Sequence, residues 1–178
     1  MARAMTRTLS INRAPVLTLW AAVVAERLGF DREEALTLGR AVAGLNAYSK
    51  GVSLGLFTPA PAELREKKKK LRPKETITID LLQRAVPAVH TKDGLRALAK
   101  DKPDNPESVE RYLESKFGDA LKDVHAAMQA LAKSRPPARL AGEAYHLYEK
   151  FRPRVPPGTR GWGAKGTLDL ATIRKLTG

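Results

Sequence analysis

The sequence predicts a mainly α-helical fold, a helical bundle with a helix-turn-helix-like N-terminal unit and one small β-hairpin. Three observations lead to this prediction. An almost wholly apolar helix begins at Pro15, and a second helix follows a capping sequence at Asp31. A long apolar stripe at helical spacing then runs from Val109 to Leu131. Only the stretch 76–91 shows the alternation that is typical of paired strands.

The first helix is expected to occupy the centre of the core. It begins at Pro15, a residue suited to the first turn of a helix, and runs to Leu28, after which Gly29 ends it. Its residues are apolar on nearly every side, which is typical of a buried helix.

The second helix starts at a capping box formed by Asp31 and Glu34 and continues to a stop at Gly51. It carries three small residues spaced four apart, Ala35, Gly39 and Ala43. A glycine inside a helix costs about 1 kcal/mol. Close approach of another helix is therefore the expected reason for this spacing.

The segment 76–91 is interpreted as a β-hairpin that turns near Gln83 and Arg84. Apolar residues alternate along its two halves: Ile77, Ile79, Leu81, Val86 and Val89. The alternative is a short helix over 80–85 that Pro87 ends, because a short apolar run does not by itself distinguish strand from helix.

Three helices are expected after the hairpin. The first is capped by Asn105 and has Pro106 at its first position. An apolar stripe runs along this helix to Leu131, and the prolines at 136–137 end it. It is the longest helix that the sequence predicts. The second has aromatic residues along one side: Tyr145, Tyr148 and Phe151. A short helix over 169–176 closes the chain.

The predicted organisation has three parts. Residues 1–58 form the helical, helix-turn-helix-like unit, residues 59–74 form a basic linker, and residues 75–178 form a helical unit with the hairpin and a basic tail. Half of the fourteen residues in 61–74 are Lys or Arg, and prolines bound this stretch. The alternative is one compact domain overall.

Composition limits the class of function. The 178 residues contain 32 Lys and Arg against 19 Asp and Glu, a formal net charge of +13, and no cysteine. Such an excess of positive charge points to polyanions, most often nucleic acid. The lack of cysteine excludes disulfides, thiolate metal sites and a cysteine nucleophile.

The basic N-terminus followed by an apolar run over 14–25 is close to the pattern of a secretory signal peptide. The run continues into a helix end and a capped helix start, however, so it is interpreted as a buried helix of a cytoplasmic protein, with nucleoid association left open. No apolar run reaches the ~20 residues of a membrane span.

Residues 21–40 resemble the helix-turn-helix of bacterial DNA-binding proteins, with Ala25 in the first helix and Gly29 at the turn. Apolar residues fall at the core positions: Val24, Leu28, Phe30, Ala35 and Leu38. The outward face of the second helix would then present Arg32, Glu33, Leu36, Thr37 and Arg40, of which Arg32 and Arg40 are the candidate DNA contacts. The alternative is a plain αα-hairpin with a glycine turn.

The linker and the tail supply the other candidate nucleic-acid-binding residues. They are Lys67, Lys68, Lys69, Lys70, Arg72, Lys74, Arg152, Arg154, Arg160, Trp162 and Lys165. The glycines of 158–163 have Walker-type spacing, but Ala164 stands where a lysine is needed, which excludes a phosphate loop of that kind. Trp162 is interpreted first as an anchor in the core and second as a stacking face.

The sequence gives no sign of catalysis, a metal or a cofactor. The three histidines, His90, His125 and His146, lie on different predicted elements without a carboxylate cluster at ligand spacing. No serine lies in the context of a nucleophile elbow. The protein is therefore expected not to be an enzyme.

The segments SINRAPVLTLWAAVVAERLGF (10–30) and GWGAKGTLDL (161–170) together resemble a set of small, basic, uncharacterised bacterial proteins. This resemblance implies no activity. The overall prediction is a protein that binds nucleic acid, DNA more than RNA, mostly through backbone phosphates. The alternative is a helical module that binds an acidic protein partner.

Overall fold

A computed structural model describes residues 8–53, 75–155 and 165–178, and these residues form a mixed α/β fold. The strands are β1 (Thr8–Asn12), β2 (Ile77–Leu81), β3 (Arg84–Thr91), β4 (Gly94–Ala99), β5 (Lys102–Pro103) and β6 (Lys165–Asp169). The helices are α2 (Arg13–Arg27), α3 (Arg32–Ser53), α5 (Pro106–Phe117), the 3-10 turn η1 (Gly118–Ala120), α6 (Leu121–Lys133), α7 (Pro137–Phe151) and α8 (Leu170–Thr177).

The predicted mainly α-helical bundle is therefore wrong. One sheet has the strand order β2-β3-β4-β5, and a second sheet pairs β1 with β6. The single hairpin that the sequence predicts corresponds to β2 and β3 alone. The other four strands are short, and two of them pair across almost the whole length of the chain, so local alternation does not reveal them.

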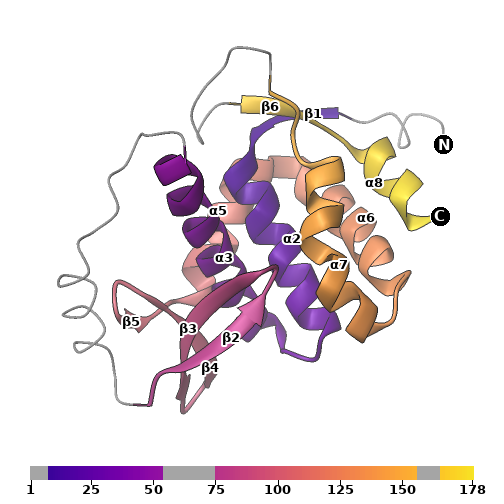
Figure 1. Cartoon of the computed structure of the whole chain (residues 1–178). Coiled ribbons are helices and arrows are strands. Elements are labelled where there is room, and N and C mark those ends of the chain that lie inside the picture. Colours follow the sequence, from indigo (N-terminus) through magenta and orange to yellow (C-terminus); the bar gives the residue numbers. More distant parts are fainter. Residues whose placement is uncertain (1–7, 54–74, 156–164) are drawn as a thin grey trace.

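Helix α2 lies at the centre of the molecule, as predicted (Figure 1). Every residue from Pro15 to Ala25 is buried. Helix α3 lies on one side of α2, and α6 and α7 lie on the other. The indole of Trp20 is fully buried, and its Nε1 donates a hydrogen bond to the carbonyl oxygen of Ala144 at 2.9 Å. The central helix thus packs against α3 on one side and against α6 and α7 on the other.

The turn between α2 and α3 has the predicted features. Gly29 has a φ of +115°, in the left-handed region that favours glycine. The capping box is formed, since the backbone nitrogen of Glu34 donates to Oδ1 of Asp31 at 2.8 Å and that of Asp31 donates to Oε1 of Glu34 at 3.1 Å. These contacts fix the angle at which α3 begins.

Gly39 explains the close approach of α3 to α2. A Cβ atom at this position would lie 3.0 Å from the backbone nitrogen of Ala22 and closer still to the carbonyl oxygen of Thr18. The two backbones are therefore in contact here, which confirms the prediction made from the small residues of this helix.

The β2–β3 hairpin is confirmed, with its turn one residue earlier than predicted. Leu82 and Gln83 form the turn with φ values of 48° and 62°, as expected for a tight two-residue hairpin turn. The sheet packs on α3, where Oγ1 of Thr37 accepts a hydrogen bond from the backbone nitrogen of Ala97 at 3.0 Å. The sheet therefore covers one face of α3.

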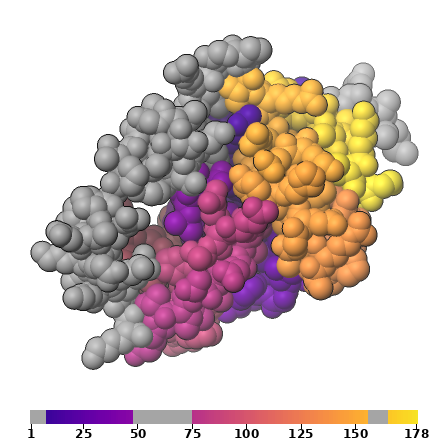
Figure 2. Space-filling model, viewed as in Figure 1, coloured from indigo at the N-terminus to yellow at the C-terminus, as the bar shows by residue number. Residues whose placement is uncertain are grey.

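A polar network joins this sheet to α3 and α7. In the space-filling view the orange surface of α7 borders the magenta surface of the hairpin (Figure 2). Oδ1 of Asn46 accepts hydrogen bonds from Nη2 of Arg84 at 2.7 Å and from the hydroxyl of Tyr145 at 3.1 Å. Asn46 is itself buried, so the network supplies its side-chain oxygen with two donors.

The helix predicted to be the longest is broken into α5 and α6. Gly118 ends α5 with φ +58° and ψ −136°, and the turn η1 leads into α6. The apolar stripe continues across the break, because Phe117 and Ala120 are both buried. The predicted spacing of buried residues therefore holds, but the continuous helix was wrong, and α3, with 22 residues, is longer than either piece.

The two ends of the described chain meet in the β1–β6 sheet, which lies at one end of the molecule (Figure 1). The predicted closing helix is α8, and Asp169 caps it by accepting from the backbone nitrogen of Ala171 at 2.9 Å. Among the described residues, buried side chains from the predicted units 1–58 and 75–178 form one hydrophobic cluster.

Candidate nucleic-acid interface

Four cations gather where α7, β6 and the start of α2 meet, and we call them the tail patch: Arg13, Arg152, Arg154 and Lys165. Nε of Arg13 donates to the carbonyl oxygen of Pro153 at 3.0 Å. The backbone of Arg154 pairs with that of Thr167 through two hydrogen bonds of 3.0 and 2.9 Å. Lys165 lies opposite Asn12 in the β1–β6 sheet. Backbone pairing thus fixes the positions from which these cations project.

The backbone around Arg154 is closely packed. A Cβ at Gly166 would lie 2.6 Å from the carbonyl oxygen of Arg154 and 3.0 Å from Cβ of Pro153. Only a glycine admits this approach. The side chains of Arg154 and Lys165 are exposed, so the strand pairing fixes the backbone of this segment and leaves both charges at the surface.

The tail patch is electrostatically unbalanced. Burial, and after it the charge of Arg152, holds the pKa of Arg13 below its usual value. Over the described ranges, no salt bridge joins any of the four cations to a carboxylate. A surface that concentrates positive charge in this way attracts anions.

Three members of the tail patch were predicted from the sequence, and Arg13 was missed as a binding residue. Arg13 is 140 positions away from Pro153, its backbone partner. The sequence places Arg13 only among the basic residues before the apolar helix. No local pattern shows that the β1–β6 pairing brings it beside Arg152.

The two predicted contacts on α3 are engaged within the protein. Nε and Nη2 of Arg40 donate to the carboxylate of Asp104 at 2.9 and 2.6 Å, and Nη2 also donates to Oγ of Ser108 at 3.0 Å. The hydrogen bond with Asp104 is the main cause of the raised pKa of Arg40. Nη2 of Arg32 donates to Oε1 of Glu110 at 2.9 Å. Both arginines thus connect α3 to α5 or to the loop before it.

Part of the face of α3 that was predicted to point outward is buried. Leu36 and Thr37 are buried, with 4% and 0% of their surface exposed. The carboxylate of Glu33 accepts from Nη2 of Arg96 on β4 at 2.7 Å. The expectation of an outward face is therefore wrong for Leu36 and Thr37. The side chains of Arg32 and Glu33 are 52% and 63% exposed, so this part of the face is open to solvent, and the helix-turn-helix interpretation stays a prediction.

Arg40→Ala is expected to lower the free energy of unfolding by ~1–2 kcal/mol, because it leaves the carboxylate of Asp104, of which only 9% is exposed, without its main partner. Urea denaturation measures this change. The matched control is Arg32→Ala, which removes an ion pair whose arginine is 52% exposed and should cost less than ~1 kcal/mol. Equal losses in the two variants would contradict the assignment.

The remaining predicted contacts lie outside the described residues. They are Lys67, Lys68, Lys69, Lys70, Arg72, Lys74, Arg160 and Trp162. The basic linker and the core-anchor interpretation of Trp162 therefore stay predictions. The buried tryptophan of the described core is Trp20.

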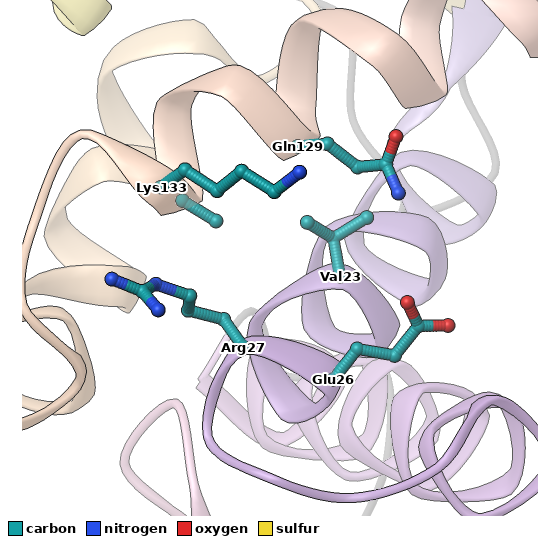
Figure 3. A pocket seen from close by; sticks show the side chains of 6 residues that line it. Val23, Glu26, Arg27, Gln129 and Lys133 are labelled. Atoms are coloured by element: carbon teal, nitrogen blue, oxygen red, sulfur yellow. The ribbon is translucent and has the colours of Figure 1, made fainter.

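A pocket of about 340 Å³ lies between the C-terminal ends of α2 and α6 (Figure 3). Its lining residues are Val23, Glu26, Arg27, Gln129, Ala132 and Lys133. Nη2 of Arg27 donates to the carbonyl oxygen of Arg135 at 3.2 Å, whereas its buried Nε has no hydrogen-bond partner among the described residues. The lining combines two cations, one carboxylate and one amide, so it lacks the uniform charge of the tail patch.

Other classes of site find no support in the described part of the chain. No group of three or more His, Asp or Glu residues there could hold a metal ion. No helix there is long and apolar enough to cross a bilayer.

The lowered pKa of His125 should make the stability of the folded chain depend on pH. Burial, and then the charge of Arg32, lowers the pKa of His125 in the folded chain, although Glu26 acts in the opposite direction. The unfolded chain therefore binds this proton more tightly, and stability should fall as the pH drops through about 6.5. Thermal melts between about pH 7.5 and about pH 5.5 should show a shallower fall for His125→Gln than for the parent. Parallel curves would show that His125 does not contribute.

Comparison with known proteins returns no match among family models, curated proteins or solved structures. The resemblance of segments 10–30 and 161–170 to small bacterial proteins therefore stays a prediction.

Proposed function

We propose that this protein binds nucleic acid, double-stranded DNA in particular, by contacting backbone phosphates with the tail patch. One observation carries the proposal. The fold brings Arg13 from the start of α2 next to Arg152, and no salt bridge to a described carboxylate neutralises them. Like charges held together in a folded protein cost free energy. A bound anion would remove that cost.

The chemistry of the tail patch suits phosphate contacts. Guanidinium groups donate parallel hydrogen bonds to phosphate oxygens, and lysine adds a mobile point charge. Such contacts carry no sequence information. We therefore expect binding with little sequence preference, in agreement with the burial of Leu36 and Thr37 on α3, which are not available to contact bases.

The test is a triple variant in which Arg152, Arg154 and Lys165 are replaced by alanine. Each side chain is removed without disturbing the backbone pairing of Arg154 with Thr167. Affinity for a random duplex should fall, most strongly at low salt. The slope of log K against log salt should become shallower by up to ~0.9 for each phosphate that the variant no longer neutralises. Fluorescence anisotropy at several salt concentrations measures both quantities.

The matched control removes three exposed cations elsewhere, Arg111, Lys116 and Lys122 on α5 and α6. Both triple variants lose the same net charge, so any difference between them reports position rather than total charge. If the two variants bind equally well, the tail patch is not the interface. If the parent does not bind duplex DNA but does bind an acidic protein, the alternative, an acidic protein partner, replaces the proposal.

A further inference from the structure

The pocket of about 340 Å³ between the C-terminal ends of α2 and α6 has an apolar floor. Val23 on α2 and Ala132 on α6 form this floor, and both residues are buried. The volume lies within the range of ~300–1,000 Å³ that is usual for sites that bind small molecules. A small apolar floor of this kind favours a ligand that carries a short hydrocarbon group.

Two cations stand on the rim of this pocket. Lys133 extends from α6, and Arg27 extends from α2 on the opposite side (Figure 3). The hydrogen bond from Nη2 of Arg27 to the carbonyl oxygen of Arg135 holds the guanidinium beside the pocket. Its Nε is buried, so the Nη end is the part that a ligand can meet. Among the residues that the structure describes, neither Arg27 nor Lys133 forms a salt bridge with a carboxylate, so both can bind an anionic group.

The same rim also carries negative charge. The carboxylate of Glu26 is 29% exposed, and its Oε1 lies 3.9 Å from Nη1 of Arg32, which is too long for a direct hydrogen bond. The C-terminal ends of two helices meet at the pocket, and each such end carries a partial negative charge. Gln129 adds an amide oxygen. These groups favour a positively charged N–H donor and disfavour a ligand that is only anionic.

We propose that this pocket binds a free α-amino acid with a small apolar side chain. The carboxylate of the amino acid contacts Arg27 and Lys133, its ammonium group donates to Glu26, and its side chain lies on the apolar floor. One small molecule then supplies a partner to the charges of both signs. The pocket lies at the opposite end of α2 from the tail patch. The inference therefore goes beyond the proposed function and does not depend on it.

The first experiment varies the ligand and leaves the protein unchanged. At millimolar concentration, at least one of L-alanine, L-valine, L-leucine and L-methionine should raise the melting temperature, because a ligand of the folded state stabilises it. The best of the four is then compared with its N-acetyl derivative, which lacks the ammonium group, and with its amide, which lacks the carboxylate. Each derivative should bind about tenfold more weakly or worse, because it loses a hydrogen bond between charged groups. If none of the four amino acids raises the melting temperature, or if the derivatives bind equally well, the inference is wrong.

The second experiment removes one cation from the rim. Lys133→Met keeps the length of an exposed side chain and removes its charge, so folding should change little. Binding of the best amino acid, measured by titration calorimetry, should weaken about tenfold. The matched control is Lys122→Met, which removes the same charge from an exposed position of α6 outside the pocket and should bind like the parent. Equal affinities in the two variants would contradict the inference and leave Lys133 only the role of balancing the helix end.

The third experiment tests the contact between Glu26 and the ammonium group. Glu26→Gln keeps the size of the side chain and removes its charge. It should weaken binding of the free amino acid, and it should leave the affinity for the N-acetyl derivative almost unchanged, because that derivative has no ammonium group to lose. A purely structural role of Glu26 would weaken both ligands by the same factor, and this result would contradict the assignment.

Discussion

Trp20→Ala is expected to lower the free energy of unfolding by ~3–5 kcal/mol, which is the usual cost of deleting a fully buried aromatic side chain. The indole has no exposed surface, and it meets the ring of Phe151 edge to face at 5.3 Å. Trp20 lies on the central helix, so its packed neighbours can fill only part of the cavity that the deleted indole leaves. Urea denaturation followed by circular dichroism measures the change.

The control for this prediction is Trp20→Phe. That variant keeps most of the buried ring and loses the hydrogen bond to Ala144, so the carbonyl oxygen loses a buried donor. Its cost should be clearly smaller than that of the alanine variant, on the order of 1–3 kcal/mol. A loss below ~1 kcal/mol for Trp20→Ala would show that the indole is not part of the core.

Gly39→Val is expected to destabilise the protein by ~3 kcal/mol or more, because the added atoms meet backbone rather than a movable side chain. A Cβ at position 39 lies 3.0 Å from the nitrogen of Ala22 and nearer to the oxygen of Thr18. Helices α2 and α3 would have to separate to admit it. Thermal melting with circular dichroism measures the loss.

The matched control for this prediction lies further along α3. Among the described residues, a Cβ at Gly44 meets no atom within 4 Å, and Gly44 is exposed. Gly44→Ala should stabilise the helix by up to ~1 kcal/mol through higher helix propensity. Opposite signs at Gly39 and Gly44 are therefore expected. A neutral result for Gly39→Val would show that the two helices are not in close contact.

Features that depend on neighbouring residues could be predicted from the sequence. The apolar helix after Pro15, the capping box at Asp31 and the close contact at Gly39 all follow from patterns within a few turns of helix. The hairpin is of the same kind, because its two strands are joined by Leu82 and Gln83 alone. Local chemistry determines each of these features.

Features that depend on distant residues could not be predicted. Pairing of β1 with β6 places Thr8 opposite Asp169, and each strand is only five residues long. The break between α5 and α6 was missed for a different reason. An apolar stripe at helical spacing passes through Gly118 without interruption, and nothing in the stripe reveals the positive φ of that glycine.

In the candidate site, too, features set by neighbouring residues could be predicted and contacts between distant residues could not. Arg152, Arg154 and Lys165 stand close together in a segment without acidic residues, so their shared basic character is visible in the sequence. Arg40 carries the same charge but bonds to Asp104, 64 positions away. Residue type alone does not distinguish a cation at an interface from a cation that holds two helices together.

The pairing of β1 with β6 also sets an order of events in time. As the chain leaves the ribosome, α2 and α3 emerge together and can pack at once, whereas β1 cannot pair until β6 has been synthesised. Pairings this far apart in sequence form slowly, because a long loop must close first. Arg13 and Lys165 therefore come together only after β6 has been synthesised. A nascent or truncated chain that stops before β6 cannot present the complete tail patch.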